Sequence, residues 1–322
     1  MSPFARCYGY WTVKEVVLTL ALVGFAAIGS NADPAKTQTA LGRAVGSGTY
    51  WCPMHPNIRG EKGDVCRICH MPLVLAPPPD YAPYHVAIET SPRGPGVGTP
   101  THIRLIVNDP RTNELVKNFE TVHERLLHLF ILSQDLTYFA HVHPALQSDG
   151  SFVYEEVFPN PGAYRLIADF LPVNGSPQFV QQTVVTSGYR GSLLPSARLT
   201  PDLADKIIDG VRIRLSMPSP VGGRAQLLTF EFLDASTGQP ISDLEPYLGA
   251  VGHLLLVSAD LQDAAHSHPV ADMSAAVGPT VVFQALFPRA TVYRFWIQVQ
   301  RHGRVIAAPF TVAVRPREPV RD

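Results

Sequence analysis

The chain has 322 residues, of which 46% are hydrophobic and 16% are charged, and its formal net charge is −1. This length predicts two or three domains, and the composition excludes a disordered chain. No basic stripe alternates with aromatic residues, which argues against nucleic acid as a partner. Thirty prolines and 24 glycines favour a turn-rich β architecture over a helical bundle.

The first 32 residues are typical of an export signal. Arg6 and Lys14 precede an apolar run over residues 16–28, and residues 30–32 supply small side chains for a cleavage site. The run is shorter than the ~20 residues of a typical spanning helix, so we expect cleavage after Ala32. The alternative is a single uncleaved membrane anchor through residues 16–29. Either way, the sequence predicts an exported protein of the periplasm or cell envelope.

A polar linker, residues 33–48, leads to the segment that is densest in metal-binding side chains, residues 49–76. This cysteine module contains the pairs Cys52-x2-His55 and Cys66-x2-Cys69. Two such pairs can surround one tetrahedral ion, and their thiolate and imidazole donors suit Zn(II) and Cu(I). A segment this short cannot bury a core, so a bound ion would contribute its stability. The alternative is a disulfide between the last two cysteines in an oxidising compartment.

The cysteine module resembles the short heavy-metal-binding domain of bacterial copper-transporting ATPases and of periplasmic adaptors of copper and silver efflux systems. The matching elements are Tyr50, Cys52-Pro53-Met54-His55-Pro56, Gly63-Asp64, Cys66-x2-Cys69, Met71 and Leu73. The resemblance implies that Cys52, Cys66 and Cys69 are metal ligands, with His55, Met54 and Met71 as further candidates. His70 adds a donor at a position where that family usually has glycine.

Residues 77–84 form a proline-rich linker, after which the pattern changes to short alternating runs bounded by turn residues. Six of these runs predict strands: 85–89, 102–107, 126–132, 152–158, 164–170 and 179–185. Helical periodicity is found best over residues 201–208, and this predicted helix is short.

An internal repeat organises this second part of the chain. A shift of 125 residues superposes His128 on His253 and the His-x-His-Pro sequence at 141–144 on that at 266–269; a later shift of 129 superposes Tyr164 on Tyr293. Each copy has about 100 residues and six or seven short strands, the size of an Ig-like sandwich. The predicted fold is therefore mainly β: a small metal-bound knuckle module followed by two tandem Ig-like antiparallel β-sandwiches. These sandwiches are expected at residues 85–186 and 210–316, with a linker at 187–209 and a tail at 317–322.

Each copy carries a trio of histidines: His128, His141 and His143 in the first, and His253, His266 and His268 in the second. Residues two apart in a strand point to the same side. Two imidazoles on one side and a third from a neighbouring strand are a suitable layout for Cu or Zn. The alternative is a core histidine at position 128, satisfied by a backbone carbonyl or by Asp135. Tyr164, Tyr293 and Trp296 are expected to be packing residues.

The sequence lacks a phosphate-binding loop, a nucleophile elbow and a His-Glu-x-x-His helix. We therefore expect a protein that is not an enzyme and that binds Cu(I) or Zn(II) for capture, buffering or delivery in the cell envelope. A metal transporter or efflux component is the expected protein partner. Two alternatives remain open: an interaction scaffold whose cysteine module is a structural zinc knot, and a metalloenzyme centred on the histidine trios.

Overall fold

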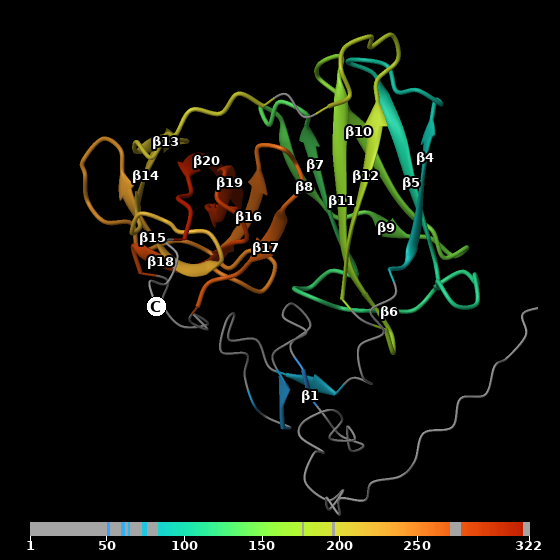
Figure 1. Ribbon diagram of the computed structural model, residues 1–322. Coiled ribbons are helices and arrows are strands. Elements are labelled where there is room, and N and C mark those ends of the chain that lie inside the picture. The colour runs from blue at the N-terminus through green and yellow to red at the C-terminus, as the bar shows by residue number, and fades with distance from the viewer. Residues whose placement is uncertain are drawn as a thin grey trace, which may run out of the picture. The chain divides into compact units, whose positions relative to one another are not determined.

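The computed structural model describes residues 50–51, 59–61, 64, 73–75, 83–175, 177–194, 197–270 and 278–317, all within a compact unit that extends from residue 45 to residue 322 (Figure 1). The predicted export signal or anchor and the linker at 33–48 lie outside the described residues. The described residues contain strands and no helix, which confirms the mainly β fold class. Accordingly, no helix in these ranges is long and apolar enough to cross a membrane.

A small sheet, in the order β2-β1-β3, belongs to the cysteine module. Its strands are β1 (Tyr50–Trp51), β2 (Arg59–Gly60) and β3 (Val74–Leu75). Asp64 holds the turn after β2, because its Oδ2 atom accepts a hydrogen bond from the Glu61 N–H at 2.8 Å and its carbonyl accepts one from Leu73 at 2.8 Å. A Cβ at Gly60 would lie 2.9 Å from Cδ1 of the buried Leu73 and closer still to the Asp64 carboxylate. Only glycine fits at this position without a shift of its neighbours.

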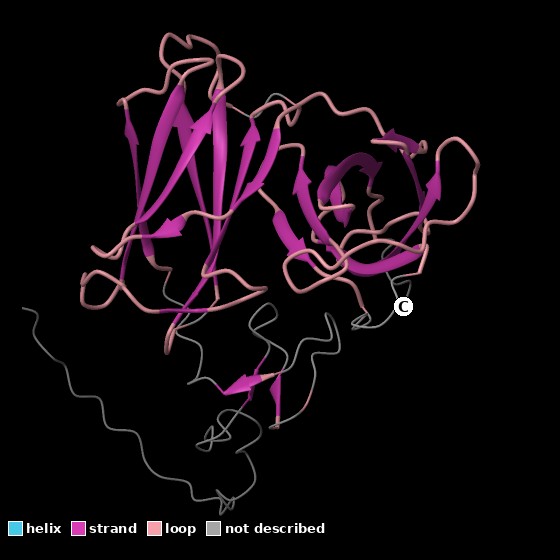
Figure 2. Cartoon of the chain, turned by 180° about the vertical axis from the view of Figure 1, so that it is seen from behind, coloured by secondary structure: helices cyan, strands magenta, loops and turns pink. Residues whose placement is uncertain are grey.

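Two sandwich-like bodies, each made of two antiparallel sheets, account for the rest of the fold (Figures 1 and 2). In the first body, one sheet has the order β4-β5-β10-β9 and the other the order β12-β11-β7-β8, with β6 beside β11. Its strands are β4 (His85–Ser91), β5 (Pro100–Asn108), β6 (Phe119–Glu120), β7 (Leu127–Ser133), β8 (Phe139–Val142), β9 (Ala145–Leu146), β10 (Phe152–Val157), β11 (Ala163–Pro172) and β12 (Gln178–Val185). All six runs predicted as strands coincide with strands of this body.

The second body pairs a sheet in the order β13-β14-β15-β18 with a sheet in the order β17-β16-β19-β20. Its strands are β13 (Lys206–Ile208), β14 (Val211–Ser216), β15 (Arg224–Asp234), β16 (His253–Ser258), β17 (Ala264–Ser267), β18 (Thr280–Phe287), β19 (Val292–Arg301) and β20 (Arg304–Ala313). Seven of these strands correspond to β4, β5, β7, β8, β10, β11 and β12 at the shifts of 125 and 129 residues, and they occupy equivalent places in the sheets. The internal repeat is therefore a repeat of the sandwich.

The helix predicted over residues 201–208 is wrong. Residues 206–208 form the edge strand β13, which pairs with β14 through a hairpin turn at Asp209 and Gly210. Both turn residues have positive φ, 49° and 78°, as the tight hairpin turn favoured by an Asp-Gly sequence requires. This local turn, together with the pairing that it allows, overrides the weak helical periodicity. The second sandwich thus begins inside the stretch that the sequence predicted as linker.

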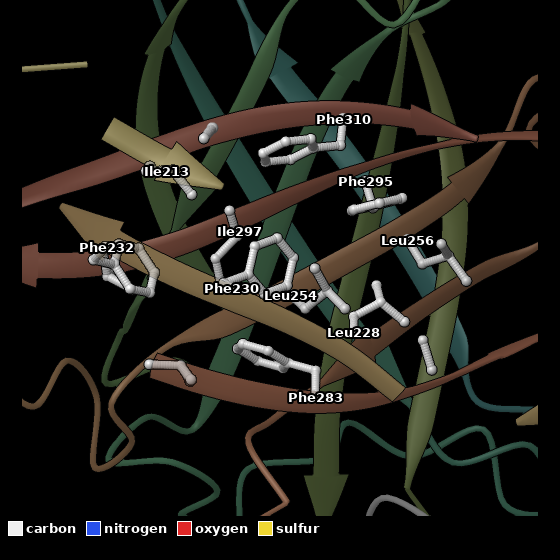
Figure 3. Packing of buried hydrophobic residues seen from close by; sticks show 14 of the residues in the cluster. Ile213, Leu228, Phe230, Phe232, Leu254, Leu256, Phe283, Phe295, Ile297 and Phe310 are labelled. Atoms are coloured by element: carbon white, nitrogen blue, oxygen red, sulfur yellow. The ribbon is translucent and has the colours of Figure 1, made fainter. Parts of the chain in front are cut away.

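Alternating apolar residues from both sheets fill the core of each sandwich. In the second body, Phe230 lies 5.7 Å from Phe283 with the rings perpendicular, and Phe295 lies 5.9 Å from Phe310 (Figure 3). All four rings are buried. Edge-to-face and offset aromatic pairs add about 0.5–1.5 kcal/mol each beyond their burial, so this cluster stabilises the packing of the two sheets.

Tyr164 and Tyr293 are buried packing residues, as predicted. The Tyr164 hydroxyl donates to the carbonyl of Asn160 at 2.8 Å, four residues upstream, which is the arrangement of a tyrosine corner. The Tyr293 hydroxyl accepts from the Arg289 N–H at 3.1 Å, also four residues upstream, and donates to Asp263 at 2.7 Å. Both rings therefore fix the connection that enters the equivalent strands β11 and β19.

A third apolar cluster joins the two sandwiches and defines what we call the inter-repeat interface. Its buried members come in equivalent pairs from the two copies: Phe130 and Leu255, Leu132 and Val257, Leu136 and Leu261, Ile167 and Trp296. The Trp296 ring stacks on Phe139 with 4.7 Å between centroids, so its predicted packing role is confirmed. The strands β7 and β16 are buried on both faces, one toward their own core and one toward the other sandwich.

Candidate metal centres

The predicted ligands of the cysteine module, Cys52, His55, Cys66 and Cys69 with Met54, His70 and Met71, lie outside the described residues. The strands that frame them are described. Trp51, which directly precedes Cys52, pairs with Arg59 on one side and with Val74 on the other. These pairings bring together the chain positions that bracket the predicted ligands.

The first histidine trio lies on the outer face of the sheet that contains β7, β8 and β11, facing the second sandwich. His128 on β7 is directly opposite Asp169 on β11, and His141 on β8 is opposite Phe130 on β7. His143 follows β8 by one residue and lies two positions from His141, on the same side of the extended chain. One ring nitrogen from each histidine of this trio lies within 4.8 Å of those of the other two.

The second trio repeats this placement on β16 and β17. His253 is opposite Gln298 on β19, and His266 is opposite Leu255 on β16. Its three ligand atoms, with His268 as the third, also lie within 4.8 Å of one another. The structure therefore brings together each trio that the sequence predicted.

In the first trio, hydrogen bonds determine which ring nitrogens carry a proton. His128 donates from Nε2 to the carbonyl of Val122 at 3.0 Å, and His141 donates from Nδ1 to Oε1 of Gln298 in the other sandwich at 2.8 Å. A neutral imidazole has one N–H, so the remaining nitrogens carry lone pairs. These two nitrogens, Nδ1 of His128 and Nε2 of His141, face each other at 3.0 Å.

The second trio has the same arrangement with one chemical difference. His253 donates from Nε2 to the carbonyl of Tyr247 at 2.8 Å, and its Nδ1 lies 3.2 Å from Nε2 of His266. Nδ1 of His266 lies 3.0 Å from Oδ2 of Asp169 in the first sandwich. Burial raises the pKa of Asp169 to about 7. When Asp169 is ionised, its carboxylate accepts a hydrogen bond from the Nδ1–H of His266 and makes this imidazole a more basic ligand, as a carboxylate does beside metal-binding histidines.

Three further nitrogens of the trios are buried without a hydrogen-bond partner among the described residues: Nε2 of His143 and both ring nitrogens of His268. Most buried polar atoms of proteins have a partner, and an orphaned one calls for an explanation such as a bound ion. Burial lowers the pKa of His143 to about 3, and burial and then the neighbouring histidines lower the pKa of His268 well below its usual value. At neutral pH these rings are therefore in the neutral form that binds metals.

The two trios differ in access to solvent. A pocket of about 640 Å³ reaches the first trio and is lined by Arg125, His141, His143 and Tyr154 among others. His143 is half-buried, whereas all three histidines of the second trio are buried. The ring of His123 stacks on His268 with 3.5 Å between centroids and an interplanar angle of 20°. His123 therefore covers the second trio.

Sequence reasoning missed His123, Asp169 and Gln298. The last two occupy equivalent positions of the repeat, and each contacts a histidine of the other copy. Asp169 and Gln298 could have been recognised in the sequence because each is a polar residue in the middle of an otherwise apolar strand. The alternative for His128 was correct in part, because the backbone carbonyl of Val122 accepts a hydrogen bond from its Nε2–H. Asp135 instead accepts hydrogen bonds from the hydroxyls of Ser133 and Thr137.

The fold and the histidine-rich interface define a tandem β-sandwich protein with an N-terminal metal-binding module. The family model described as "Domain of unknown function (DUF8832)" matches residues 81–188 and 206–316, more than half of the chain, and the chain belongs to this family. The model "Heavy metal binding domain" matches residues 49–75, which confirms the resemblance seen in the sequence. No curated protein gives a significant match.

Several solved structures match this chain at low similarity. The adhesin InvE of Yersinia pseudotuberculosis is 10% identical, with a TM-score of 0.22 and coverage of 73% of this chain and 61% of that one. A Salmonella alpha-2-macroglobulin mutant is 10% identical, with a TM-score of 0.25 and coverage of 77% and 17%. A red sea bream transglutaminase is 14% identical, with a TM-score of 0.22 and coverage of 73% and 31%. The chain thus spans less than two thirds of the length of each of these proteins.

Proposed function

We propose that this protein is an exported heavy-metal-binding protein that captures, buffers or delivers Cu(I) or Zn(II) in the cell envelope. The observation that carries the proposal is the heavy metal binding domain at residues 49–75, which contains the donor pairs Cys52-x2-His55 and Cys66-x2-Cys69. Thiolate and imidazole donors favour these ions over Mg²⁺ or Ca²⁺. The predicted export signal supports the location, and a transporter or efflux component of the envelope is the proposed recipient.

The test compares the parent protein with a Cys52→Ser/Cys66→Ser variant in anaerobic titrations with Cu(I) and with Zn(II), each against a competing chelator. We expect the variant to lose one tightly bound ion per chain, because two of the soft donors are gone. The same stoichiometry and affinity in both proteins would sink the proposal. His55→Ala provides a graded comparison, since it removes one donor and leaves the three thiols.

A structural zinc knot is the alternative role of the same module, and chelation separates the two roles. A capture or delivery site gives up its ion reversibly while the sheet β2-β1-β3 remains protected. A structural zinc knot, in contrast, unfolds when its ion is removed. Hydrogen exchange of residues 50–75, measured by mass spectrometry before and after chelation, distinguishes the two roles. We expect the amide of Leu73, which donates to Asp64, to keep its protection without metal.

A further inference from the structure

We propose that the inter-repeat interface holds two further metal ions, one at each histidine trio, in a centre independent of the cysteine module. Its ligands are imidazoles alone, which suit first-row divalent ions such as Zn(II) and Cu(II). Both trios lie in the two sandwiches, within the residues that the DUF8832 family model matches.

The ligand atoms of each trio are spaced for a single ion. Two nitrogens that bind one tetrahedral ion at 2.0–2.1 Å are about 3.3 Å apart. Nδ1 of His128 lies 3.0 Å from Nε2 of His141, and Nδ1 of His253 lies 3.2 Å from Nε2 of His266. Each pair is therefore already spaced as two ligands of a single ion.

Hydrogen-bond acceptors hold the histidine protons away from the paired nitrogens. The carbonyls of Val122 and Tyr247 can only accept, so they place the protons of His128 and His253 on the nitrogens that point away from the pairs. Gln298 does the same for His141. Ligating histidines typically donate their second N–H to such an acceptor, which orients the ring and leaves the lone pair for the ion. In the first trio, two lone pairs face each other at 3.0 Å, and a cation between them turns this repulsion into two bonds.

Each trio also supplies a third histidine ligand. His143 and His268 have buried ring nitrogens without a hydrogen-bond partner among the described residues, and each belongs to a trio whose ligand atoms lie within 4.8 Å. His268 is 3% exposed. Leaving such a polar group buried and unpaired is destabilising, and a metal ion satisfies it.

Hydrogen bonds across the interface connect the two proposed metal sites. Gln298 of the second sandwich orients His141 of the first, and Asp169 of the first orients His266 of the second. The rings of His141 and His266 are 5.5 Å apart. Metal binding therefore requires both sandwiches and clamps them together. The first position exchanges its ion through the pocket at His143 and retains an open coordination place, whereas the second is closed over by His123.

The test uses the full chain with Cys52, Cys66 and Cys69 replaced by Ser, so that a failure of the cysteine module does not affect the result. The metal-free protein is incubated with Zn(II), desalted in the presence of a weak chelator and analysed for zinc. We expect two ions per folded chain. Retention of one ion or none by a protein with an unchanged β-sheet circular dichroism spectrum overturns the proposal.

In this background, His143→Ala and His268→Ala are each expected to reduce the stoichiometry from two to one. The matched control is His102→Ala/His302→Ala, because these exposed histidines pair with Glu155 and Asp243 on the surface and should leave two ions in place. Loss of zinc in the control as well would overturn the assignment to the trios.

Cu(II) bound to the parent of these variants provides a measurement that does not depend on the folding of a mutant. We expect electron paramagnetic resonance with hyperfine splitting from at least two imidazole nitrogens per copper. A spectrum without imidazole splitting would contradict the proposed ligands.

Discussion

Acidification of the metal-free protein should separate the two sandwiches between pH 6.5 and pH 5. Six histidines of the interface have lowered pKa values. Five of them are buried, namely His128, His141, His253, His266 and His268, and the half-buried His123 stacks on His268. Burial, the largest cause for each, lowers their pKa from 6.5, to about 3 for His123 and His253 and to about 4 for His128. In the exposed state each ring regains a pKa near 6.5 and binds a proton that the folded interface excludes.

The direction and the size of the pH effect on the free energy of opening follow from this difference in bound protons. Below pH 6.5 the opened protein binds more protons than the folded one, so the free energy of opening falls as the pH falls. Each ring contributes about 1.4 kcal/mol per pH unit until its folded pKa is reached. Six rings together remove about 8 kcal/mol at pH 5.5. Asp169 offsets about 2 kcal/mol of this loss, because burial raises its pKa to about 7 and it is therefore protonated in the folded interface and ionised in the opened state. The net loss of about 6 kcal/mol is comparable with the entire stability of a typical domain, about 5–15 kcal/mol. Above pH 6.5 the contribution of the histidines disappears, because their rings are neutral in both states.

The assay follows Trp296, whose ring stacks on Phe139 across the interface. A Trp11→Phe/Trp51→Phe variant makes it the single tryptophan of the chain. We expect its fluorescence to report exposure with a midpoint between pH 5 and 6, at or before the loss of the β-sheet signal in circular dichroism, because each sandwich keeps its own core. Saturating Zn(II) should move the midpoint to lower pH.

His268→Phe removes one titrating ring at similar volume and should lower the midpoint by about 0.2 pH units, one sixth of the summed effect. The surface variant His102→Ala/His302→Ala should leave the midpoint unchanged. A metal-free protein whose Trp296 signal stays constant down to pH 4 would refute the reasoning, because the buried histidines would then impose no proton-linked cost.

Three substitutions test the packing described above, each by urea unfolding of the metal-free protein. Trp296→Ala should reduce the free energy of unfolding by about 3–5 kcal/mol, since it leaves a cavity against Phe139, and a loss below 1 kcal/mol would place the ring outside the interface. Gln298→Leu should cost about 1–3 kcal/mol because it leaves the buried Nδ1–H of His141 unpaired; a stabilised variant would contradict that bond. Tyr164→Phe should cost about 1 kcal/mol for the lost corner hydrogen bond, and no change would show that water replaces it.

The strands could be predicted because their alternation and turn residues are local properties of the sequence. The histidine trios could also be predicted, since the spacing in the His-x-His-Pro sequence and the period of a strand bring residues 141 and 143 to one side. The repeat added the equivalence of the two copies, which the sheet orders reproduce. The heavy metal binding domain was recognisable because its donors are concentrated in few residues.

The meeting of the two trios could not be predicted in this way. It depends on which face of β7 packs against which face of β16, a contact between residues about 125 positions apart. The apolar runs around His128 and His253 did carry a signal, because strands buried on both faces imply a further layer of protein. Asp169 and Gln298 were overlooked because each appears in its own strand as an isolated polar residue, and its partner lies in the other copy.

The reciprocal contacts of the interface have a consequence for how the two trios can differ. His141 contacts Gln298 and its equivalent, His266, contacts Asp169, which is the reciprocity that an isologous homodimer of a single repeat would have. In that dimer, residues 169 and 298 would be the same amino acid. Covalent fusion of the two subunits permits the difference between Asp169 and Gln298. The fused chain can therefore give its two trios unequal affinities, which a symmetric homodimer cannot encode.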